Sequence, residues 1–594
     1  MNEARTRQSN NSPPRTGLFR TLACRSNSRI GASGSRVGTL AALRWSASPL
    51  LLRAISFGWL AVWFAGLNLR PLGEPDEARY AEVAREMFAS GNWLTPKLDG
   101  FNFFDKPALQ YWASALFYSL FGVHEWSARL WVALTGLLAM LAVGWAGKRL
   151  YGARTGWVAA VVLGSTLLFV AGAHINTMDM GVAAFLTVAI CLFLVAQFDP
   201  AAARQRQLLN LLGWTSVALA VLSKGLIGLV LPAITLAVFM LLEKDWSILR
   251  RMTMGWGLCV VLCICAPWFV AISLRHPDFF DYFFIKEHFS RFLTNAYDRD
   301  RQWWFFIPVV LLGLFPWAVF LPLSRSGWRN ALESRSERFL LCWIVVVLVF
   351  FSASHSKLPF YILPIFPALA ILIARRLSTL TIRALAWRFM GISALAVTLA
   401  LIALALTIST RHLSQHIDMR PAQMWLMRGL GALAIVSAAC AFLLTRRFSP
   451  ATVVSLLGFT TLLVWQMLFA NIVTIANNLS AAPVAQLMLP RMHANTEVFT
   501  VHAYLRGLPF YLQRVVTVAD EDPDDLLAGV PSRPEGFVTN ISAFEARWSS
   551  APSAVAVVDP RLLSSFRADK LPMRIIGSTS SGVVIERPRD ATTP

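Results

Sequence analysis

Residues 73–120 read GEPDEARYAEVAREMFASGNWLTPKLDGFNFFDKPALQYWASALFYSL, a stretch that combines charge, aromatic side chains and helix-starting residues. Pro75 followed by the carboxylates of Asp76 and Glu77 is typical of a helix start, where negative charge complements unpaired N–H groups. Apolar residues then recur at the spacing of an amphipathic helix, at Tyr80, Val83, Ala84, Met87 and Phe88. The opposite face carries the charged residues Arg79, Glu82, Arg85 and Glu86. Pro107 suits the first turn of a second helix, so the stretch predicts two short helices at a membrane surface.

Composition identifies the class of protein. The chain has 594 residues, of which 56% are hydrophobic and 15% are charged, and its mean hydropathy is +0.54. Soluble domains average roughly 45–50% apolar and about 25% charged residues. Apolar runs of the ~20 residues that a bilayer requires also recur along the chain. These features predict a polytopic α-helical membrane protein.

The formal net charge of +21 raises the question of a nucleic-acid partner. The basic residues are spread over an N-terminal tail and many short loops instead of forming one patch. Arginines at membrane borders, beside anionic lipid headgroups, explain this distribution. We therefore expect contact with membrane lipids and none with nucleic acid.

Thirteen hydrophobic segments are candidate membrane spans. They lie at residues 51–69, 126–147, 155–173, 179–197, 207–223, 225–242, 254–274, 303–322, 339–353, 359–374, 384–408, 427–445 and 451–475. The first span follows a tail, residues 1–50, with eight arginines and a single acid, Glu3. We expect this tail to be disordered and cytoplasmic.

Loop charge tests this topology. With the tail in the cytoplasm, each loop that follows an even-numbered span is short and basic, as the positive-inside rule requires. The loops with candidate functional residues all fall on the opposite, outer side. Residues 51–478 are thus predicted to form a transmembrane catalytic domain whose outer loop, residues 70–125, contains the two interfacial helices.

The sequence changes character after about residue 480. Residues 497–501 and 553–558 resemble short strands, and helices are expected at residues 520–527 and 541–546. We predict a small soluble α/β domain at residues 479–594, packed on the outer face of the membrane domain. It contains no glycine-rich phosphate loop, so nucleotide chemistry is not expected there.

Three carboxylates are candidate catalytic residues. Asp76 and Glu77 either cap a helix or place one acid against a reacting group while the other supports the loop. Asp179 begins an apolar segment, where an unpaired acid is unfavourable, so it is either an N-cap or a second acid of the site.

Basic residues in the outer loops suit a lipid phosphate. Lys106 lies at an interfacial helix start, where it either binds such a phosphate or extends toward the headgroups as a structural lysine. Lys357 and Tyr361 occupy a tight outer turn with the same two readings. Asp105 and His288 are of the residue types that bind zinc or manganese, although one such pair also fits a structural role. Charges at segment ends, instead of at the bilayer midplane, favour an enzyme over a transporter.

Six motifs then resemble a known family. In chain order they are PDEARYAEVAREMFASGNWLTPKLDG, FFDKPALQYW, FGVHEWSARLW, HINTMDMG, FFIKEHFSRF and SKLPFYILP. They resemble the polyprenyl-phosphate-sugar glycosyltransferases of the C superfamily, and among these the aminoarabinose transferases of Gram-negative bacteria that act on lipid A. The resemblance covers residues 73 to about 363. It implies a glycosyltransferase C fold in the bacterial inner membrane, with the C-terminal domain in the periplasm.

The resemblance also implies roles for single residues. Asp76 is then the principal catalytic carboxylate and Asp179 a second acid at the site. The phosphate of an undecaprenyl donor would be held by Arg79, Lys106 and Arg291, with Tyr361 closing the site. Asp105 and His288 match positions that bind a divalent metal (zinc, magnesium or manganese). These enzymes usually have glutamate where this chain has Asp105.

The reaction implied is inverting transfer of a sugar, 4-amino-4-deoxy-L-arabinose, from undecaprenyl phosphate to a lipid A phosphate. One alternative is a related transferase that acts on protein or another glycan. A lipid flippase or transporter is the alternative from a different class.

Overall fold

The computed structural model describes residues 49–290, 301–321, 332–409, 420–446, 448–471, 473–521 and 526–588. The predicted disordered tail lies outside this part of the chain, apart from Pro49 and Leu50, which begin the first helix, α2 (Pro49–Ala65). Residues 47–594 form one compact unit.

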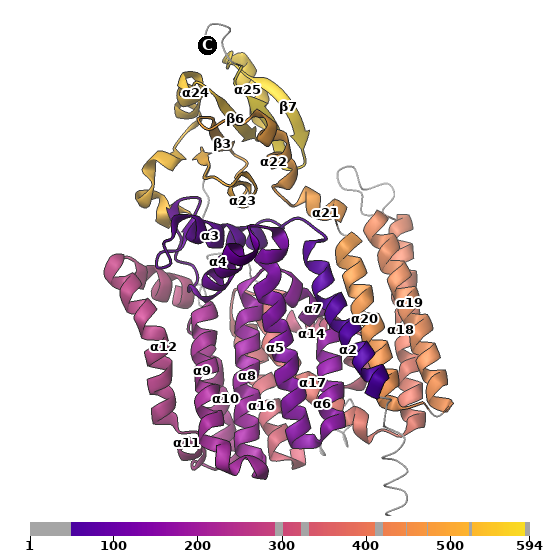
Figure 1. The fold of residues 1–594 in the computed structure, drawn as a ribbon. Coiled ribbons are helices and arrows are strands. Elements are labelled where there is room, and N and C mark those ends of the chain that lie inside the picture. The colour runs from indigo at the N-terminus through magenta and orange to yellow at the C-terminus, as the bar shows by residue number, and fades with distance from the viewer. Residues whose placement is uncertain are drawn as a thin grey trace, which may run out of the picture. The chain divides into compact units, whose positions relative to one another are not determined.

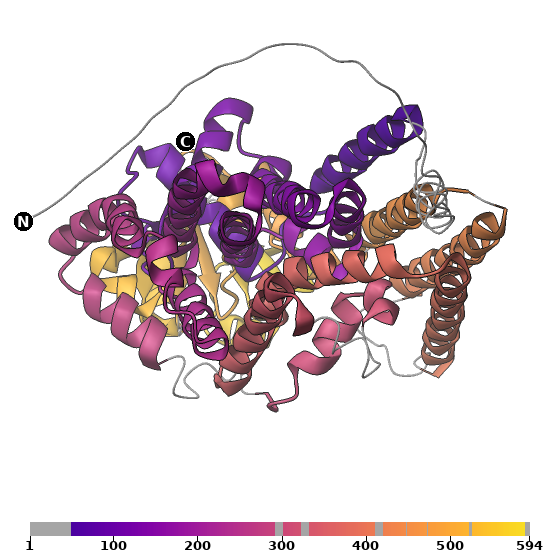
Figure 2. The same cartoon turned by 90° about the horizontal axis from the view of Figure 1, so that it is seen from below.

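A helix, in some cases interrupted, lies at every predicted hydrophobic segment. After α2 the main helices are α5 (Glu125–Tyr151), α6 (Ala153–Ser165), α7 (Leu167–His174), α8 (Met178–Phe198), α9 (Arg206–Lys224), α10 (Ile227–Glu243), α12 (Met254–Arg275), α14 (Phe306–Gly313), α16 (Arg335–Ala353), α17 (Phe366–Thr379), α18 (Ile382–Ser409), α19 (Arg420–Thr445) and α20 (Pro450–Asn471). The short helix η4 (Trp317–Phe320) follows α14, and η5 (Pro359–Ile365) precedes α17. Seen from below in Figure 2, the indigo α2 stands beside the orange α20.

Fewer helices meet the conditions for crossing a membrane than there are helical segments. Within the described residues, eight helices are long and apolar enough to cross a bilayer, counting η5 and α17 as one. The pair α6 and α7, bent by 66°, would make a ninth. Helices α2, α9, α10 and α14 do not meet both conditions. Thirteen helical segments are therefore confirmed, whereas thirteen crossings stay a prediction.

The bend between α6 and α7 positions a loop of the site. Thr166, at the break, is in the extended conformation, and its hydroxyl donates to the carbonyl of Val162 at 2.6 Å. The chain then turns back after α7, and the backbone N–H of Asn176 reaches the carboxylate of Glu77 at 3.0 Å.

The two predicted interfacial helices are present as α3 (Asp76–Ser90) and α4 (Leu109–Phe121). A small hairpin, β1 (Lys97–Leu98) and β2 (Phe101–Asn102), connects them. Helix α3 ends at Gly91, whose φ of 67° is in the left-handed region that suits glycine. In Figure 1 both helices lie across the ends of the long helices, below the C-terminal sheet.

The charged face of α3 differs from the expectation for a surface helix. Glu82, Arg85 and Glu86 are buried. Arg85 forms a bidentate pair with Glu82 at 2.6 and 2.7 Å, and both oxygens of Glu86 accept the N–H of Gly100. The reason is tertiary: α4, the hairpin and α23 (Leu508–Leu512) all pack against α3 and cover both of its faces.

The predicted C-terminal α/β domain is confirmed as a six-stranded sheet with the order β5-β4-β3-β6-β8-β7. The strands are β3 (Glu497–Val501), β4 (Thr517–Ala519), β5 (Phe537–Val538), β6 (Ala554–Val558), β7 (Arg574–Thr579) and β8 (Gly582–Glu586). Strand β3 is parallel to β4 and β6, and β4 is parallel to β5. Strand β8 is antiparallel to β6 and β7.

The expected strands at residues 497–501 and 553–558 match β3 and β6, and the helix expected at 541–546 is α24 (Ile541–Ser550). The helix expected from Asp520 is wrong in its described part. Asp520 has a φ of 46°, neither it nor Glu521 is helical, and residues 522–525 lie outside the described chain. The backbone N–H of Asp520 donates to the carbonyl of Val538 in β5 at 2.7 Å, and its carboxylate bonds His502 Nε2 at 2.8 Å, so Asp520 extends the sheet instead of starting a helix.

The two faces of the sheet bury different partners. One face packs on α24 and α25 (Leu563–Ala568), through Phe499, Val501, Ala556, Val558, Phe544, Trp548 and Phe566. The other face shares one continuous apolar core with α3 and α4, including Val498, Val518, Val555, Val557, Val584, Tyr80, Val83 and Tyr118. The interfacial helices are thus folded against the C-terminal domain as well as against the long helices.

Candidate active site

The segment that opens α3 is fixed by the carboxylate of Glu77. Arg70, in the loop after α2, donates to it at 2.5 and 3.1 Å, and Arg129 on α5 donates at 2.8 and 3.1 Å. The backbone N–H groups of Gly73 and Asn176 donate to it as well, both at 3.0 Å. Glu77 is 3% exposed and Arg129 is 1% exposed. The carboxylate therefore joins α3 to three other parts of the membrane domain: the loop after α2, helix α5 and the loop after α7.

Charge explains how an acid can be buried there. Burial alone would raise the pKa of Glu77, but the guanidinium groups of Arg129 and Arg70 outweigh it and hold the pKa well below its usual range. Glu77 is thus an anion whose oxygens are taken up by arginine and backbone donors. This geometry favours the supporting reading of Glu77 that the sequence left open.

Asp76 is in a different position one residue earlier. It is the first residue of α3, its side chain is 36% exposed, and it pairs with Arg79 one turn later. The guanidinium carbon of Arg79 lies 5.2 Å from the ring centre of Tyr80 and 5.7 Å from that of Phe103. Asp76 is accessible at the edge of a buried cationic and aromatic group.

Lys106 precedes α4 and pairs with an acid far along the chain. Its Nζ lies 3.1 Å from Glu287, in the π-helix η3 (Asp281–Ser290), and donates to the carbonyl of Asp105 at 2.6 Å. The hydroxyl of Tyr282, on the same η3, donates to Asp105 Oδ1 at 2.7 Å. Burial, followed by the charge of Glu287, raises the pKa of Asp105. Two carboxylates, one lysine and one phenol thus meet between α4 and η3.

Asp179 is the second residue of α8 and pairs with Lys224 at the end of α9. Lys224 Nζ also lies 4.4 Å from the ring centre of Tyr361 in η5. Three elements therefore bring the predicted residues Asp179 and Tyr361 to one cation.

Tyr80, next to Arg79 on α3, is buried, and its ring centre lies 6.4 Å from that of Tyr111 on α4. Burial is the main cause that raises the pKa of Tyr80 above its usual range. The charge of Arg79 lowers this pKa, and the charges of Asp76, Asp105 and Asp179 raise it. Arg79 connects Tyr80 to Asp76, since its guanidinium pairs with Asp76 and lies over the Tyr80 ring. Burial raises the pKa of Tyr111 on α4, and Tyr80, Asp105 and Arg79 also act on that pKa. The buried Tyr111 hydroxyl has no hydrogen-bond partner among the described atoms.

Three predicted residues are not assigned to this region. Arg291 lies outside the described residues, and so does the side chain of His288, although its backbone belongs to η3. Lys357 lies in the turn before η5, where its buried Nζ donates to the carbonyl of Ser354 at 2.6 Å.

Sequence reasoning missed two charged partners, Lys224 and Glu287. Lys224 stands alone between two apolar runs, and an ionisable residue at such a place is a functional candidate by default. That signal was present in the sequence. Glu287 shares a short motif with other charged residues, and no local pattern distinguishes it as the partner of Lys106.

A divalent metal finds oxygen donors of suitable chemistry in Asp105 and Glu287. Within the described part of the chain, however, no three His, Cys, Asp or Glu side chains lie close enough to hold a metal ion. The described residues therefore fit a metal in part, with two carboxylates.

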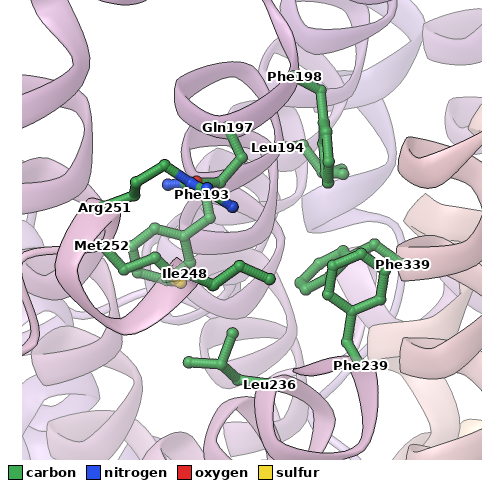
Figure 3. Close-up of a pocket in the computed structure, with 10 residues that line it drawn as sticks. All are labelled: Phe193, Leu194, Gln197, Phe198, Leu236, Phe239, Ile248, Arg251, Met252 and Phe339. Carbon is green, nitrogen blue, oxygen red and sulfur yellow. The ribbon is translucent and has the colours of Figure 1, made fainter. Parts of the chain in front are cut away.

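Two neighbouring cavities lie elsewhere, among α8, α10, α12 and α16. The larger, of about 330 Å³, has almost entirely apolar walls. Figure 3 shows the smaller one, in which Arg251 and Gln197 lie at one side of a mainly apolar lining. Both share Phe193, Leu236, Met252 and Phe339, and neither lining includes a carboxylate. The described carboxylates that could carry acid–base chemistry lie instead at the starts of α3, α4 and α8.

Solved structures share this architecture. The crystal structure of ArnT from Cupriavidus metallidurans bound to undecaprenyl phosphate matches with a TM-score of 0.85 and 30% sequence identity, over 92% of this chain and 100% of that chain. This chain belongs to the ArnT family. The apo form of the same ArnT matches with a TM-score of 0.84. The predicted class, a polytopic helical membrane protein with a C-terminal α/β domain, is confirmed by this membership.

Other comparisons agree with ArnT. Residues 484–587 match the aminoarabinose transferase C-terminal domain, and residues 105–270 match the dolichyl-phosphate-mannose-protein mannosyltransferase family. An undecaprenyl phosphate-alpha-4-amino-4-deoxy-L-arabinose arabinosyl transferase of Erwinia tasmaniensis is 35% identical over 52% of this chain and 56% of its own length. A protein of the same name in Sodalis glossinidius, numbered 1, is 37% identical over 53% and 58%, respectively. The chain thus matches a little over half the length of these curated relatives.

Proposed function

We propose that this ArnT-family chain is an inverting glycosyltransferase that moves 4-amino-4-deoxy-L-arabinose from undecaprenyl phosphate to a lipid A phosphate. The observation that carries the proposal is a set of acids paired with cations: Asp76 with Arg79, Asp179 with Lys224, and Glu287 with Lys106, which also bonds the carbonyl of Asp105. Acids beside fixed cations suit transfer from a phosphate leaving group. The names of the curated relatives specify the sugar and the donor.

The cations act on the donor. Lys106 and Arg79, joined by the predicted Arg291, hold the phosphate of undecaprenyl phosphate. As the bond between the anomeric carbon and the phosphate oxygen breaks, that oxygen keeps the electron pair and gains charge. Preorganised cations stabilise this charge more in the transition state than in the ground state. Lys357 and Tyr361 are further candidates for the donor phosphate.

Asp76 acts on the acceptor. An acceptor oxygen attacks the anomeric carbon from the face opposite the leaving phosphate, which inverts the configuration. Asp76 orients this acceptor, and it takes up the proton where the acceptor is a hydroxyl. A lipid A phosphate is already ionised, so base catalysis contributes less than orientation there. Asp179, paired with Lys224, is the second candidate acid. Glu77 supports the loop.

A divalent metal is part of the proposal. Asp105, with Glu287 or His288, would hold it, and the bound metal would neutralise donor phosphate charge. Zinc, magnesium and manganese are all compatible with carboxylate ligands.

The proposed location is the bacterial inner membrane, with residues 51–478 as the membrane domain and residues 479–594 in the periplasm. The sheet and the α3–α4 loop share one core, which supports their being on the same side. The basic loops at the other ends of the helices support a cytoplasmic N-terminus.

The test is mass spectrometry of lipid A from cells that express the wild-type chain or Asp76→Asn. We expect the wild type to add one aminopentose and Asp76→Asn to add none, while the thermal unfolding midpoint stays the same. Asp559→Asn, in the exposed Arg561 pair of the C-terminal domain, is the control. Full transfer by Asp76→Asn would overturn the assignment.

A second candidate is a transferase that acts on protein or another glycan, which the mannosyltransferase match at residues 105–270 favours. Transfer of radiolabelled sugar from the lipid donor to protein, with lipid A unchanged, identifies that case. Any enzymatic transfer excludes a flippase as the whole function.

A further inference from the structure

Glu74, two residues before Asp76, joins the start of α3 to the C-terminal part of the chain. Its backbone N–H donates to the carbonyl of Leu479 at 2.7 Å. Its carboxylate accepts the backbone N–H of Gly507 at 2.7 Å and that of Arg506 at 3.1 Å. One residue thus bonds to the C-terminal domain at two places, its first residue and the turn before α23.

Gly507 shows how close this approach is. A Cβ atom added there would lie 2.7 Å from the Cβ of Ala78 and 2.8 Å from Oε1 of Glu74. The φ of Gly507 is −90°, which any residue adopts. Glycine is therefore needed for space, because the C-terminal domain packs directly on the first turn of α3.

Asp76 lies between two anchors of opposite origin. Glu74 and the N–H of Leu72, which donates to the Tyr511 hydroxyl at 2.8 Å, bind this segment to the C-terminal domain. Glu77 binds it to Arg70 and Arg129 of the membrane domain. Asp76 is the more exposed carboxylate between them. Three neighbouring acids thus divide into two anchors and one accessible group.

We propose that Glu74 is a positioning residue. Its bonds to the C-terminal domain hold the first turn of α3 in place, and with it the side chains of Asp76 and Arg79. The C-terminal domain is then required for the chemical step as well as for folding. This inference rests on the proposed function. A displacement of a catalytic group by about 1 Å lowers rates by about 10²-fold, so loss of the anchor acts mainly on kcat.

A second contact of the same two parts provides a matched control. Arg533 donates to the carbonyl of Asp99 at 2.6 Å and to that of Val516 at 3.0 Å. It holds the C-terminal domain to the β1–β2 loop and does not contact residues 72–79 in any described bond. Arg533→Ala weakens domain docking without touching the segment of Asp76.

The experiment uses the full-length protein in detergent with undecaprenyl phosphate-linked aminoarabinose as donor. We expect Glu74→Ala and Gly507→Ala to lower kcat at least tenfold and to change KM for the donor less than threefold. Arg533→Ala should change kcat less than twofold. Gly431→Ala, at a helix position with no atom within 4 Å of the added Cβ, controls for the glycine substitution. Equal losses in Glu74→Ala and Arg533→Ala, or no loss in Glu74→Ala, overturn the inference.

Amide hydrogen exchange separates this inference from the proposed function. The N–H groups of Ala78 and Arg79 close the first turn of α3 on Gly73 and Pro75. They should exchange at least tenfold faster in Glu74→Ala and Gly507→Ala than in the wild type, and less than twofold faster in Arg533→Ala. This result supports the anchor even if no sugar transfer is found. Unchanged exchange in Glu74→Ala overturns it even if the enzyme is active.

Discussion

Removal of the Glu77 carboxylate is the perturbation for which the structure gives the clearest magnitude. Glu77→Ala leaves Arg129, which is 1% exposed, and the mostly buried Arg70 beside each other without a counter-charge. Breaking a buried ion pair in this way costs about 3–5 kcal/mol, because the remaining charge is no longer compensated. Folded proteins are stable by only about 5–15 kcal/mol in total. We therefore expect Glu77→Ala to lower the free energy of unfolding by about 3–5 kcal/mol.

A double-mutant cycle measures whether the pair itself is responsible. Arg129 also donates to the carbonyls of Leu67, Arg70 and Pro71, so Arg129→Ala has a cost of its own. Once Glu77 is gone, removing Arg129 also removes an uncompensated charge. The double variant should thus be more stable than the sum of the single effects by about 2 kcal/mol.

The assay is equilibrium unfolding in detergent micelles, followed by tryptophan fluorescence. The pair of Asp559 and Arg561, whose side chains are 15% and 90% exposed, serves as the control cycle, because pairs at the surface contribute about 0–1 kcal/mol. A loss below about 1 kcal/mol in Glu77→Ala, or an additive cycle with Arg129, would refute the reasoning.

Three further outcomes are expected. Lys106→Ala leaves the acids Asp105 and Glu287 together without their cation, so binding of undecaprenyl phosphate, measured by calorimetry, should weaken at least tenfold; unchanged affinity would contradict the phosphate role. Burial raises the pKa of Asp99 to about 8. Protonated Asp99 therefore stabilises the fold fully below about pH 4, and this stabilisation is lost as the pH rises to about 8. The thermal midpoint of the wild type should fall over this range relative to Asp99→Asn, and parallel midpoints would exclude the effect. Removal of divalent metal by a chelator should weaken undecaprenyl phosphate binding by the wild type and not by Asp105→Ala, and equal responses would exclude a metal at Asp105.

Much of the fold is readable from local patterns. The Pro75, Asp76 and Glu77 run indicates a helix start because unpaired N–H groups attract carboxylates, and α3 begins at Asp76. Apolar length identifies the long helices for a similar reason, since burial in lipid requires continuous apolar side chains. The charged face of α3 shows where this reasoning ends. Glu82 and Arg85 lie on the charged face of the predicted amphipathic helix, yet they are buried, because sequence pattern does not reveal what a distant domain covers.

The sequence predicted which residues form the candidate site better than it predicted which of them pair with each other. Asp76, Lys106 and Asp179 carry local signals, since each is a charge at the end of an element. Their partners are set by tertiary structure: Glu287 lies 181 positions from Lys106, and Lys224 lies 45 positions from Asp179. Such pairings depend on which side chains of separate elements face each other. No spacing within one segment contains that information.

The continuous core between the C-terminal sheet and the interfacial helices has a consequence for how the protein is made. A ribosome completes α3 and α4 hundreds of residues before it reaches β8. Until then, the apolar side chains of Tyr80, Val83 and Tyr118 lack the valines of the sheet that cover them. The α3–α4 loop therefore completes its packing last, although it is synthesised early. In a chain that ends before the sheet, the apolar side chains of α3 and α4 remain uncovered on that face.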